Sequence, residues 1–278
     1  MINVEVRLNK TVNDSYSIFI GKGITEFIFE QIKTQNLAYS YVIITDSNVK
    51  QLYGDILLKK MRLIFPRVEL ISFPAGEQNK NRETKSYLED KMLELKFARD
   101  SAIIALGGGV VGDIAGFVAA TYVRGLNYIQ IPTSLVACVD SSIGGKTAVD
   151  TKHGKNLIGA FHQPKAVFIN TDTLKTLNKK EINEGLAEVI KYGVIMDKNF
   201  FSYLEENIEE VHKHDDEVIL NIIKTSCMIK AEVVKKDEKE SNLRKILNFG
   251  HTIGHAIEQL SEYTISHGEA ISRGMVLE

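Results

Sequence analysis

The sequence predicts an α/β domain with a mostly parallel, Rossmann-like sheet, followed by a second domain that is all helical. Up to about residue 170, runs rich in β-branched residues alternate with helical periods, which favours strands joined by crossover helices. A glycine-rich turn lies between one of these strands and a helix, as in nucleotide-binding folds. After about residue 178, only helical periods follow one another. We therefore predict a nucleotide-binding domain over 1–175 and a helical domain over 176–278.

The predicted strands are apolar runs that end at Gly, Asp or Pro. They cover residues 2–8, 16–20, 41–46, 67–73, 102–107, 128–132 and 166–170. Helical stretches such as 82–97 separate them. The predicted helices of the second part cover 181–196, 199–212, 215–236, 244–261 and the residues from 268 onward. Because the sequence stops inside the last helical period, we expect the natural domain to be longer.

Composition narrows the class of protein. The chain has 278 residues, 44% hydrophobic and 25% charged, which is typical of a soluble globular protein with one large or two ordinary domains. Its net charge of −2 gives no indication of a nucleic-acid or membrane partner. Cys138 and Cys227 lie in apolar surroundings far apart in sequence. Together with the lack of a signal peptide, they predict reduced thiols in a cytoplasmic protein.

The stretch 101–123 resembles a membrane span, since Asp113 is its single charge. However, it contains five glycines, and the charge lies near its centre. These features favour a buried strand, a tight turn and a buried helix in a protein without a membrane span.

The turn itself satisfies the G-x-G-x-x-G spacing through Gly107, Gly109 and Gly112. After a strand and before a helix, this spacing lets backbone N–H groups and the helix N-terminus face a diphosphate. The usual acid about 20 residues further on is missing, because the next strand ends at 132–134. Asp46, which closes an earlier strand, is an alternative ribose contact. A merely tight strand-to-helix turn remains the other interpretation.

A second glycine-rich segment, 140–156, carries Lys146, Lys152 and Lys155. Its glycines allow a close approach to a ligand, and its lysines supply point charges for phosphate. The segment differs from the ATPase P-loop because Asp140 stands where the first glycine should be. We predict a ligand-binding loop, with a plain surface loop as the alternative.

Two helical patterns in the second part carry polar side chains on one stripe. In the segment 181–193, Glu184, Glu188 and Lys191 share a stripe, although an exposed Glu–Lys pair would give the same pattern. The other pattern consists of Arg244, Asn248, His251 and His255 at steps of four, three and four. If 244–261 is one helix, these four lie on one face. A solvated polar face is the alternative, but such faces usually carry Lys and Glu.

These histidines are followed by His267 in a separate segment. One carboxylate and several imidazoles from different helices are the donor set of a tetrahedral zinc site with a position left open for substrate. The pair His251 and His255 alone would be weak evidence, because two histidines four residues apart also occur on helices that bind no metal.

Six motifs occur in order along the chain: PAGEQNK, GGGVVGD, DSSIGGKTAVD, GKNLIGAFHQP, GLAEVIKYG and NFGHTIGHAIE. Through them the sequence resembles the 3-dehydroquinate synthases from about residue 46 to its end. The resemblance implies one active site that holds NAD and a divalent metal, Zn2+ or Co2+, between a nucleotide-binding domain and a helical metal- and substrate-binding domain. It also implies the metal ligands Glu188, His251 and His267.

The remaining site residues are likewise implied by the resemblance alone. The NAD contacts would come from Asp46, Glu77, Lys80, Gly109, Val110, Val111, Gly112, Asp113, Thr133, Ser134, Lys146, Lys155, Thr173, Leu174, Lys175 and Thr176. The substrate contacts would come from Arg124, Asp140, Lys146, Asn156, Lys191, Lys230, Arg244, Asn248 and His255. His255 would therefore face the substrate and not the metal, and Arg124 would reach the neighbouring subunit of a homodimer.

The implied reaction converts 3-deoxy-D-arabino-heptulosonate 7-phosphate, a small anionic sugar phosphate, into 3-dehydroquinate and phosphate. This is the work of a lyase in the shikimate pathway of aromatic amino-acid and chorismate biosynthesis. Three alternatives stay open: a sister cyclase acting on an uncarboxylated sugar phosphate, an NAD- and metal-dependent polyol dehydrogenase, and a catalytically silent NAD-binding protein. In the sister cyclase Arg244 would have no carboxylate to bind, and it would instead be a structural partner of Glu184 or Asp237.

Overall fold

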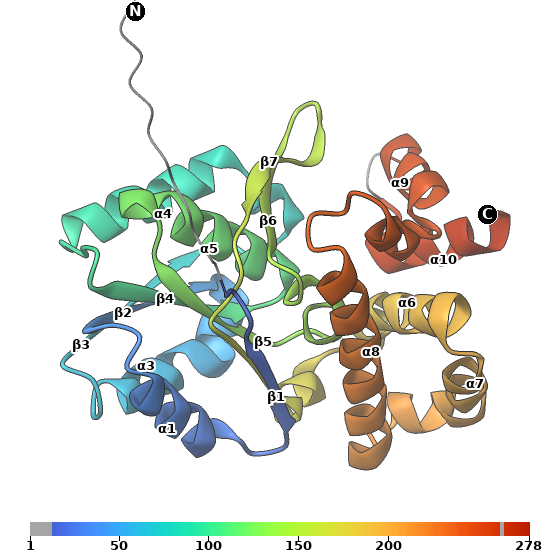
Figure 1. The fold of residues 1–278 in the computed structure, drawn as a ribbon, viewed down its shortest axis with the longest axis horizontal. Coiled ribbons are helices and arrows are strands. Elements are labelled where there is room, and N and C mark those ends of the chain that lie inside the picture. Colours follow the sequence, from blue (N-terminus) through green and yellow to red (C-terminus); the bar gives the residue numbers. More distant parts are fainter. Residues whose placement is uncertain (1–12, 262–263) are drawn as a thin grey trace, which may run out of the picture.

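The computed structural model describes residues 13–261 and 264–278. Its main sheet has six strands in the order β1–β8–β5–β4–β2–β3, and all neighbouring strands are parallel (Figure 1). The strands are β1 (Ser17–Gly21), β2 (Ser40–Asp46), β3 (Arg67–Phe73), β4 (Ser101–Gly107), β5 (Asn127–Pro132) and β8 (Ala166–Asn170). The parallel Rossmann-like sheet is thus confirmed, while the predicted strand 2–8 lies outside the described residues.

Helices cover both faces of this sheet. On one face, α1 (Thr25–Gln35) and α3 (Asp55–Met61) pack against the sheet, and on the other α4 (Arg82–Glu94) and α5 (Gly109–Thr121) do so. Successive residues of β2 belong alternately to the two cores, with Ile43 in the first and Val42 in the second. Because both faces are buried, the strand reads as a continuous apolar run without polar alternation. The segment 101–123 is accordingly a buried strand, a turn and a helix, as predicted.

The remaining short elements of the first part are turns of helix. They are α2 (Ser47–Val49), η1 (Lys50–Gly54), η2 (Glu77–Asn79), η3 (Tyr122–Arg124), η4 (Ala137–Ser141) and η5 (Thr171–Thr176). Several of them follow the carboxyl ends of strands, which all lie at one edge of a parallel sheet. This edge is where ligands bind in open α/β folds.

A two-stranded antiparallel hairpin, β6 (Lys146–Thr151) and β7 (Gly154–Phe161), projects beside the main sheet (Figure 1). The sequence predicted a loop over 140–156, so that prediction is wrong for much of the segment. The strands approach closely at Gly159, where a Cβ atom would lie 1.9 Å from the carbonyl oxygen of Thr147. Glycine and lysine have a low intrinsic preference for strands, so the sequence does not indicate this pairing. The two strands are stabilised by contact with each other.

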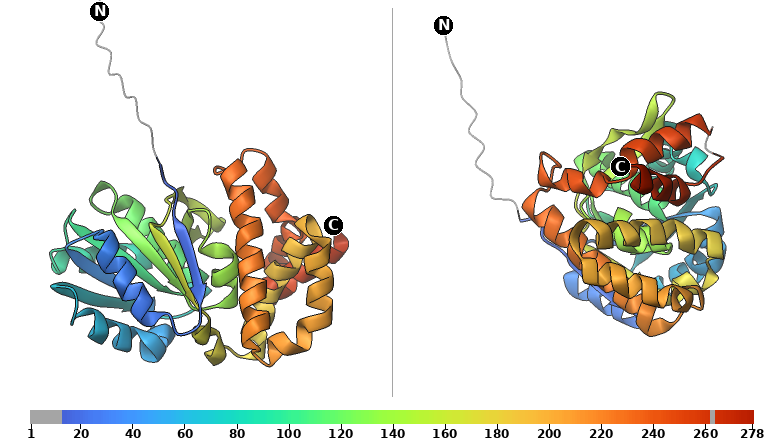
Figure 2. Two further views of the ribbon diagram at one scale, coloured as in Figure 1. Left: turned by 60° about the horizontal axis from the view of Figure 1, so that its bottom comes forward. Right: turned by 90° about the vertical axis from the view of Figure 1, so that its right-hand side faces the viewer.

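The second part consists of helices packed at the β1–β8 edge of the sheet (Figure 2). They are α6 (Lys179–Met196), α7 (Lys198–His212), α8 (Asp216–Lys236), η6 (Leu243–Asn248), α9 (His251–Leu260) and α10 (His267–Leu277). A capping box, in which the Asn178 side chain and Glu181 satisfy each other's backbone N–H groups, begins α6. Among the described residues, no strand follows residue 178, which agrees with the prediction.

One predicted helix is wrong. The span 244–261 is not continuous: η6 ends at Asn248, and α9 starts at His251. Phe249 is extended with ψ 130°, and Gly250 has φ 78°, a left-handed conformation that favours glycine. The four polar residues of the sequence stripe therefore lie on two differently oriented helices, and only His251 and His255 share a helical face.

The helical part shares its hydrophobic core with the sheet. One cluster of buried side chains joins Val167 and Ile169 of β8 to Leu186 of α6 and Ile222 of α8. The side chains of Ile18 and Ile20 in β1 pack against the same cluster. Strands β1 and β8 and the helices that follow residue 178 are therefore held together by apolar contact.

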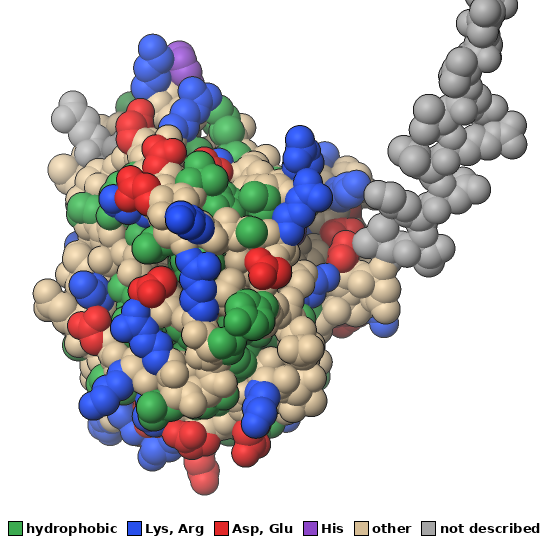
Figure 3. All heavy atoms as spheres, turned by 90° about the vertical axis from the view of Figure 1, so that its left-hand side faces the viewer, with side chains coloured by type: hydrophobic (Ala, Val, Ile, Leu, Met, Phe, Trp, Pro, Cys, Tyr) green, Lys and Arg blue, Asp and Glu red, His purple; other side chains and the backbone are tan. Residues whose placement is uncertain are grey.

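The surface carries charges of both signs. On the face that Figure 3 shows, Lys and Arg side chains alternate with Asp and Glu side chains and with apolar ones. This mixture agrees with the small net charge of −2. Within 13–261 and 264–278, none of the helices combines the length and apolar character that crossing a bilayer requires.

We predict that Gly268→Ala destabilises the protein. A Cβ atom at Gly268 would lie 2.6 Å from the Cα atom of Glu184, so α10 must shift away from α6. Overpacking of this kind typically lowers the free energy of unfolding by about 1–3 kcal/mol. Denaturant titration measures the loss, and Ser272→Ala on the same helix is the control. A Gly268→Ala protein as stable as the control would contradict this packing.

Candidate active site

The carboxylate of Glu188 on α6 is surrounded by basic groups from three helices. Its side chain is only 1% exposed, and its Oε1 atom lies 3.4 Å from Nε2 of His251 and 3.4 Å from Nε2 of His267. Its Oε2 atom accepts a hydrogen bond from Lys191 one turn further along α6. Burial acts to raise the pKa of Glu188, but Lys191 and the two imidazoles hold that pKa well below its usual range. The carboxylate is therefore ionised and available as a ligand.

The two imidazoles that face Glu188 also have partners behind them. Nδ1 of His251 lies 3.1 Å from the carbonyl oxygen of Phe249, and Nδ1 of His267 lies 3.3 Å from Oε2 of Glu258. A neutral imidazole that donates from Nδ1 keeps its Nε2 lone pair free for a metal. One ligand atom each from Glu188, His251 and His267 lies within 4.8 Å of the others. This donor set fits a divalent zinc-like cation with an open coordination position.

A second group of charges lies beside the first, around Asp140 of η4. Its Oδ1 atom is 2.8 Å from Nζ of Lys230 on α8 and 4.0 Å from Nζ of Lys191, and it accepts a hydrogen bond from the Tyr192 hydroxyl. Burial acts to raise the pKa of Asp140, but Lys230 and Lys191 lower it to about 2. Since Lys191 contacts both Asp140 and Glu188, the two groups form one continuous network of charges.

The glycine-rich turn lies at the carboxyl edge of the sheet. β4 ends at Gly107, and α5 begins at Gly109 without a side-chain cap, so the N–H groups of its first turn can face an anion. A Cβ atom at Gly112 would lie 2.7 Å from Gln130, so this helix needs a glycine to pack on β5. The turn therefore suits a nucleotide diphosphate, and its contacts with NAD stay a prediction.

A buried lysine lies next to this turn. Nζ of Lys80 lies 2.5 Å from Oδ2 of Asp113 and 2.7 Å from Oδ1 of Asn156. Burial acts to lower the pKa of Lys80, but the carboxylates of Asp113 and Glu77 raise it above its ordinary value. Three predicted NAD residues, Glu77, Lys80 and Asp113, thus lie together, and Asn156, a predicted substrate residue, joins them.

The other predicted NAD residues lie at strand ends or near them. Asp46 ends β2 and accepts hydrogen bonds from the first N–H groups of α2, while Thr133 and Ser134 directly follow β5. The residues 173–176 lie in η5 after β8, where the hydroxyl groups of Tyr53 and Thr176 are 2.7 Å apart. The side chains of two further residues lie in the hydrophobic cores and can offer a ligand only their backbone: Val111 and Leu174.

Arg244 is 1% exposed, and its guanidinium donates to the carbonyl oxygens of Gly144 and Glu238. A Cβ atom at Gly144 would lie 2.3 Å from the guanidinium, so a glycine is needed there. Among the described contacts, this side chain makes no ion pair with Glu184 or Asp237. Asp237 instead accepts the backbone N–H of Arg244, at 3.0 Å, and so fixes the loop that carries the arginine.

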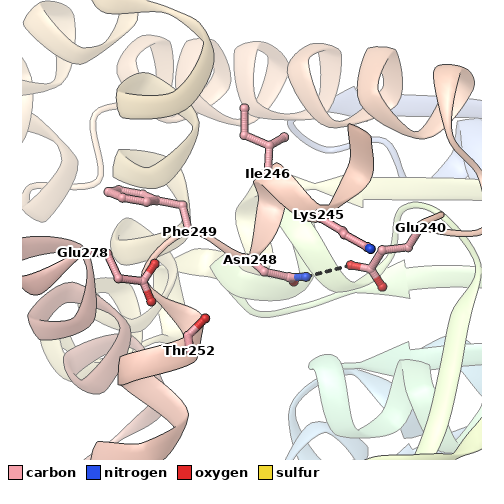
Figure 4. A pocket seen from close by; sticks show the side chains of 7 residues that line it. All are labelled: Glu240, Lys245, Ile246, Asn248, Phe249, Thr252 and Glu278. Atoms are coloured by element: carbon pink, nitrogen blue, oxygen red, sulfur yellow. Dashed lines mark hydrogen bonds between the residues drawn. The ribbon is translucent and has the colours of Figure 1, made fainter. Parts of the chain in front are cut away.

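Lys146 and Asn248 meet at an acid that the sequence did not single out. Both donate to the carboxylate of Glu240, Lys146 to Oε2 and Asn248 to Oε1 at 2.9 Å. The pair of lysine and amide therefore lies between the hairpin and η6, on an exposed rim of the site. A pocket of about 520 Å³ opens next to Asn248 and Glu240, between η6 and α9 (Figure 4).

Two further predicted substrate residues, His255 and Arg124, are exposed, as Lys146 and Asn248 are. The side chain of His255 is 54% exposed, and its Nε2 atom lies 3.9 Å from Oε2 of Glu258. Arg124 is exposed and has φ 72°, next to Val123 with φ 44°. A left-handed conformation in two successive non-glycine residues is rare and costs free energy. The backbone therefore turns sharply where Arg124 projects from the surface.

Glu258 is a site residue that the sequence reasoning missed. It is 2% exposed, and its carboxylate contacts His267 and also Nζ of Lys155 on β7, at 2.9 Å. Burial acts to raise the pKa of Glu258, but His267 and Lys155 lower it to about 2. The sequence could have indicated Glu258 as a site residue. It ends the motif NFGHTIGHAIE and lies on the same helical face as His251 and His255.

Comparison with known proteins shows which family the chain belongs to. Residues 70–184 match the 3-dehydroquinate synthase N-terminal family, and residues 185–278 match the 3-dehydroquinate synthase C-terminal family. The chain is 48% identical to the 3-dehydroquinate synthase of Acetivibrio thermocellus, over 98% of its own length and 75% of that protein. It is 52% identical to that of Thermoanaerobacter pseudethanolicus, over 94% and 74%.

The chain belongs to the 3-dehydroquinate synthase family. Among solved structures, it is similar to 2-deoxy-scyllo-inosose synthase complexed with carbaglucose-6-phosphate, NAD+ and Co2+, with a TM-score of 0.86 and 29% identity over 93% of this chain and 70% of that one. It is also similar to 2-epi-5-epi-valiolone synthase from Streptomyces hygroscopicus subsp. jinggangensis with NAD+ and Zn2+ bound, with a TM-score of 0.88 and 27% identity over 98% and 75%. A likeness to glycerol dehydrogenase from Schizosaccharomyces pombe, 15% identical with a TM-score of 0.71, shows a common fold.

We predict that one divalent cation binds per chain and that His251→Ala weakens its binding at least about 100-fold, because one of three protein ligands is lost. Calorimetric titration of the metal-free protein with Zn2+ measures the affinity. His212→Ala is the control, since His212 lies on α7 and contacts Asn183. If His251→Ala binds zinc as tightly as the control does, Glu188, His251 and His267 are not the ligands.

Proposed function

We propose that the chain converts 3-deoxy-D-arabino-heptulosonate 7-phosphate into 3-dehydroquinate and phosphate, with NAD and one divalent metal, Zn2+ or Co2+, as cofactors. The observation that carries this proposal is the convergence of Glu188, His251 and His267 beside the network of Asp140, Lys191 and Lys230. Membership of the 3-dehydroquinate synthase family selects this reaction. The two sugar-phosphate cyclases are less than 30% identical, whereas the two 3-dehydroquinate synthases are about 50% identical.

The two cofactors would supply chemistry that amino-acid side chains lack: NAD would accept and return a hydride, and the metal would provide a Lewis acid for the substrate hydroxyl. Glu188, His251 and His267 would hold the metal. The turn that opens α5, together with Asp46, Glu77, Lys80 and Asp113 and the residues after β5 and β8, would hold NAD. Held by these residues, the two groups would act on the same substrate.

The cations of the site suit a substrate with two anionic ends. Two N–H groups of the Arg244 guanidinium donate to carbonyl oxygens. We assign its remaining N–H groups, together with Lys230, to the substrate carboxylate. Lys146, Asn248 and His255 are all exposed and are assigned to the phosphate.

Asp140, Lys191 and Asn156 complete the proposed set of substrate contacts. The side chain of Lys191 is 2% exposed and that of Asp140 is 25% exposed, so the charge of Lys191 acts with little screening by water. They are suited to orient the substrate hydroxyl groups.

The two predicted domains would have different roles in binding the cofactors and the substrate. Residues 1–175 would bind NAD, and residues 176–278 would supply the metal ligands and most of the substrate contacts. We also propose a homodimer in the cytoplasm, in which Arg124 enters the active site of the neighbouring subunit. The exposure of Arg124 and the turned backbone that presents it support this arrangement, and two buried free cysteines suit a reducing compartment.

We predict that phosphate and 3-dehydroquinate form in equal amounts while no NADH accumulates, because the hydride returns to the substrate. Phosphate release and absorbance at the nicotinamide wavelength are followed together, with zinc and less NAD than substrate. A polyol dehydrogenase would instead produce one NADH for each substrate molecule oxidised, and a silent NAD-binding protein would release no phosphate.

We further predict that mixing two inactive variants restores activity. Arg124→Ala would lose the arginine that it gives to its partner, and Lys191→Ala would lose its own site. If Arg124 acts across a dimer, each mixed dimer has one complete site, so random reassociation restores about a quarter of the natural activity. Activity measured after mixing and reassociation tests this. No recovery, with mixed dimers present on native mass spectrometry, would place Arg124 outside the neighbouring site.

A further inference from the structure

The carboxylate of Glu258 lies where the helical part meets the β6–β7 hairpin. Its side chain is 3% exposed, although it is a charged group. Burial of a carboxylate is costly unless charged or hydrogen-bonding partners compensate for the lost water. Glu258 has such partners on both oxygens: Oε1 lies 2.9 Å from Nζ of Lys155, and Oε2 lies 3.3 Å from Nδ1 of His267. Each oxygen therefore faces a different part of the molecule.

The contact with His267 fixes how that imidazole is oriented. Nδ1 of His267 faces Glu258, and Nε2 faces Glu188, at 3.4 Å. With the proton on Nδ1, the Nε2 lone pair points to the proposed metal position. An anionic acceptor also makes the imidazole a stronger base and hence a stronger ligand. His251 differs, because its Nδ1 atom faces only the neutral carbonyl group of Phe249. At Nδ1, His267 thus faces a charged group and His251 a neutral one.

The contact with Lys155 reaches the nucleotide-binding part. Lys155 lies on β7, and its Nζ atom is also 3.9 Å from Oε1 of Glu77. Glu77 and Lys155 are both proposed NAD contacts, while His267 is a proposed metal ligand. One buried carboxylate therefore connects the two cofactor positions through direct contacts on either side.

We propose that Glu258 is a positioning residue that holds the metal ligand His267 and the NAD contact Lys155 at the same time, so that one negative charge sets the affinity for both cofactors. This inference rests on the proposed NAD and metal sites. A purely structural carboxylate would fix the helix without discriminating between the cofactors. A positioning carboxylate alters zinc binding through His267 and NAD binding through Lys155.

The test is Glu258→Gln, which keeps the shape of the side chain and removes its charge. We expect its zinc dissociation constant to rise about 10–100-fold, since that is the usual effect of losing the partner of a ligating histidine. NAD affinity should also fall. Zinc affinity is measured by competition with a coloured chelator, and NAD affinity by calorimetry. Glu269→Gln is the matched control, because Glu269 is an exposed acid of α10 that pairs with Arg273. It should change neither constant by more than about twofold.

A second variant probes the other end of the contact. Lys155→Met keeps Glu258 but removes the ammonium group that pairs with it. The negative charge next to His267 is then less neutralised, so zinc should bind as tightly as before or tighter. NAD should bind more weakly, because one of its proposed contacts is lost. Co2+ serves as a spectroscopic probe, and its absorption bands should shift in Glu258→Gln but not in Glu269→Gln. A helix-stabilising role for Glu258 would not move those bands.

The outcomes separate this inference from the proposed function. A natural protein that binds neither zinc nor NAD would overturn the proposed function itself. A natural protein that binds both, with unchanged zinc affinity and cobalt spectrum in Glu258→Gln, would overturn only the role of Glu258. If Glu258→Gln does not fold, Lys155→Met decides the question: a tenfold loss of zinc affinity in that variant would be opposite to the expected effect and would refute the proposal.

Discussion

The buried carboxylate of Glu188 is the constraint on which the arrangement of the helical part depends. Side chains from three helices must reach it: Lys191 from α6, His251 from α9 and His267 from α10. Helices can converge so closely only where side chains are small. Glycines occupy these crossings, since a Cβ atom at Gly254 or Gly268 would lie within 3 Å of the neighbouring helix. At these crossings the glycines place no side chain between the helices, and the close approach lets the charged groups meet.

Such a centre does not follow from stability alone. Buried ion pairs recover the cost of desolvation only with good geometry, and apolar replacements of similar volume are often as stable. Here the network extends from Glu188 through Lys191 to Asp140 and Lys230, which come from η4, α6 and α8. Its members are the residues assigned to metal and substrate. The surrounding apolar cluster, shared by β8, α6 and α8, keeps them at fixed separations. Preorganised charges of this kind stabilise developing charge without reorganising during the reaction.

The sequence predicts correctly those strands and helices that depend on local residue patterns. Continuous apolar runs gave the strands of the sheet, and periodicity gave α6, α7 and α8 close to their observed bounds. The prediction failed at the β6–β7 hairpin, whose strands pair around Gly159 but whose glycines and lysines resemble a loop in sequence. It also failed at Gly250, where the helical period on both sides outweighed a glycine that breaks the helix. The ligand set came from the resemblance, and the residues brought together by tertiary contacts, Glu240 and Glu258, went unnoticed.

The structure presents two candidate groups of metal ligands, and electrostatics separates them. Glu188 with His251 and His267 forms one group, while His255, Glu258 and His267 form the other. In the second group Glu258 already neutralises Lys155, at 2.9 Å, so a cation there would have to compete with an ammonium. His255 is also largely exposed, which leaves its Nε2 atom in exchange with water. Glu188 is likewise paired with a lysine through one oxygen, but its Oε1 atom lies 3.4 Å from both imidazoles, whereas Oε2 of Glu258 lies 3.3 Å from His267 and 3.9 Å from His255. The first group therefore offers three converging donors, and the second supports it through the shared His267.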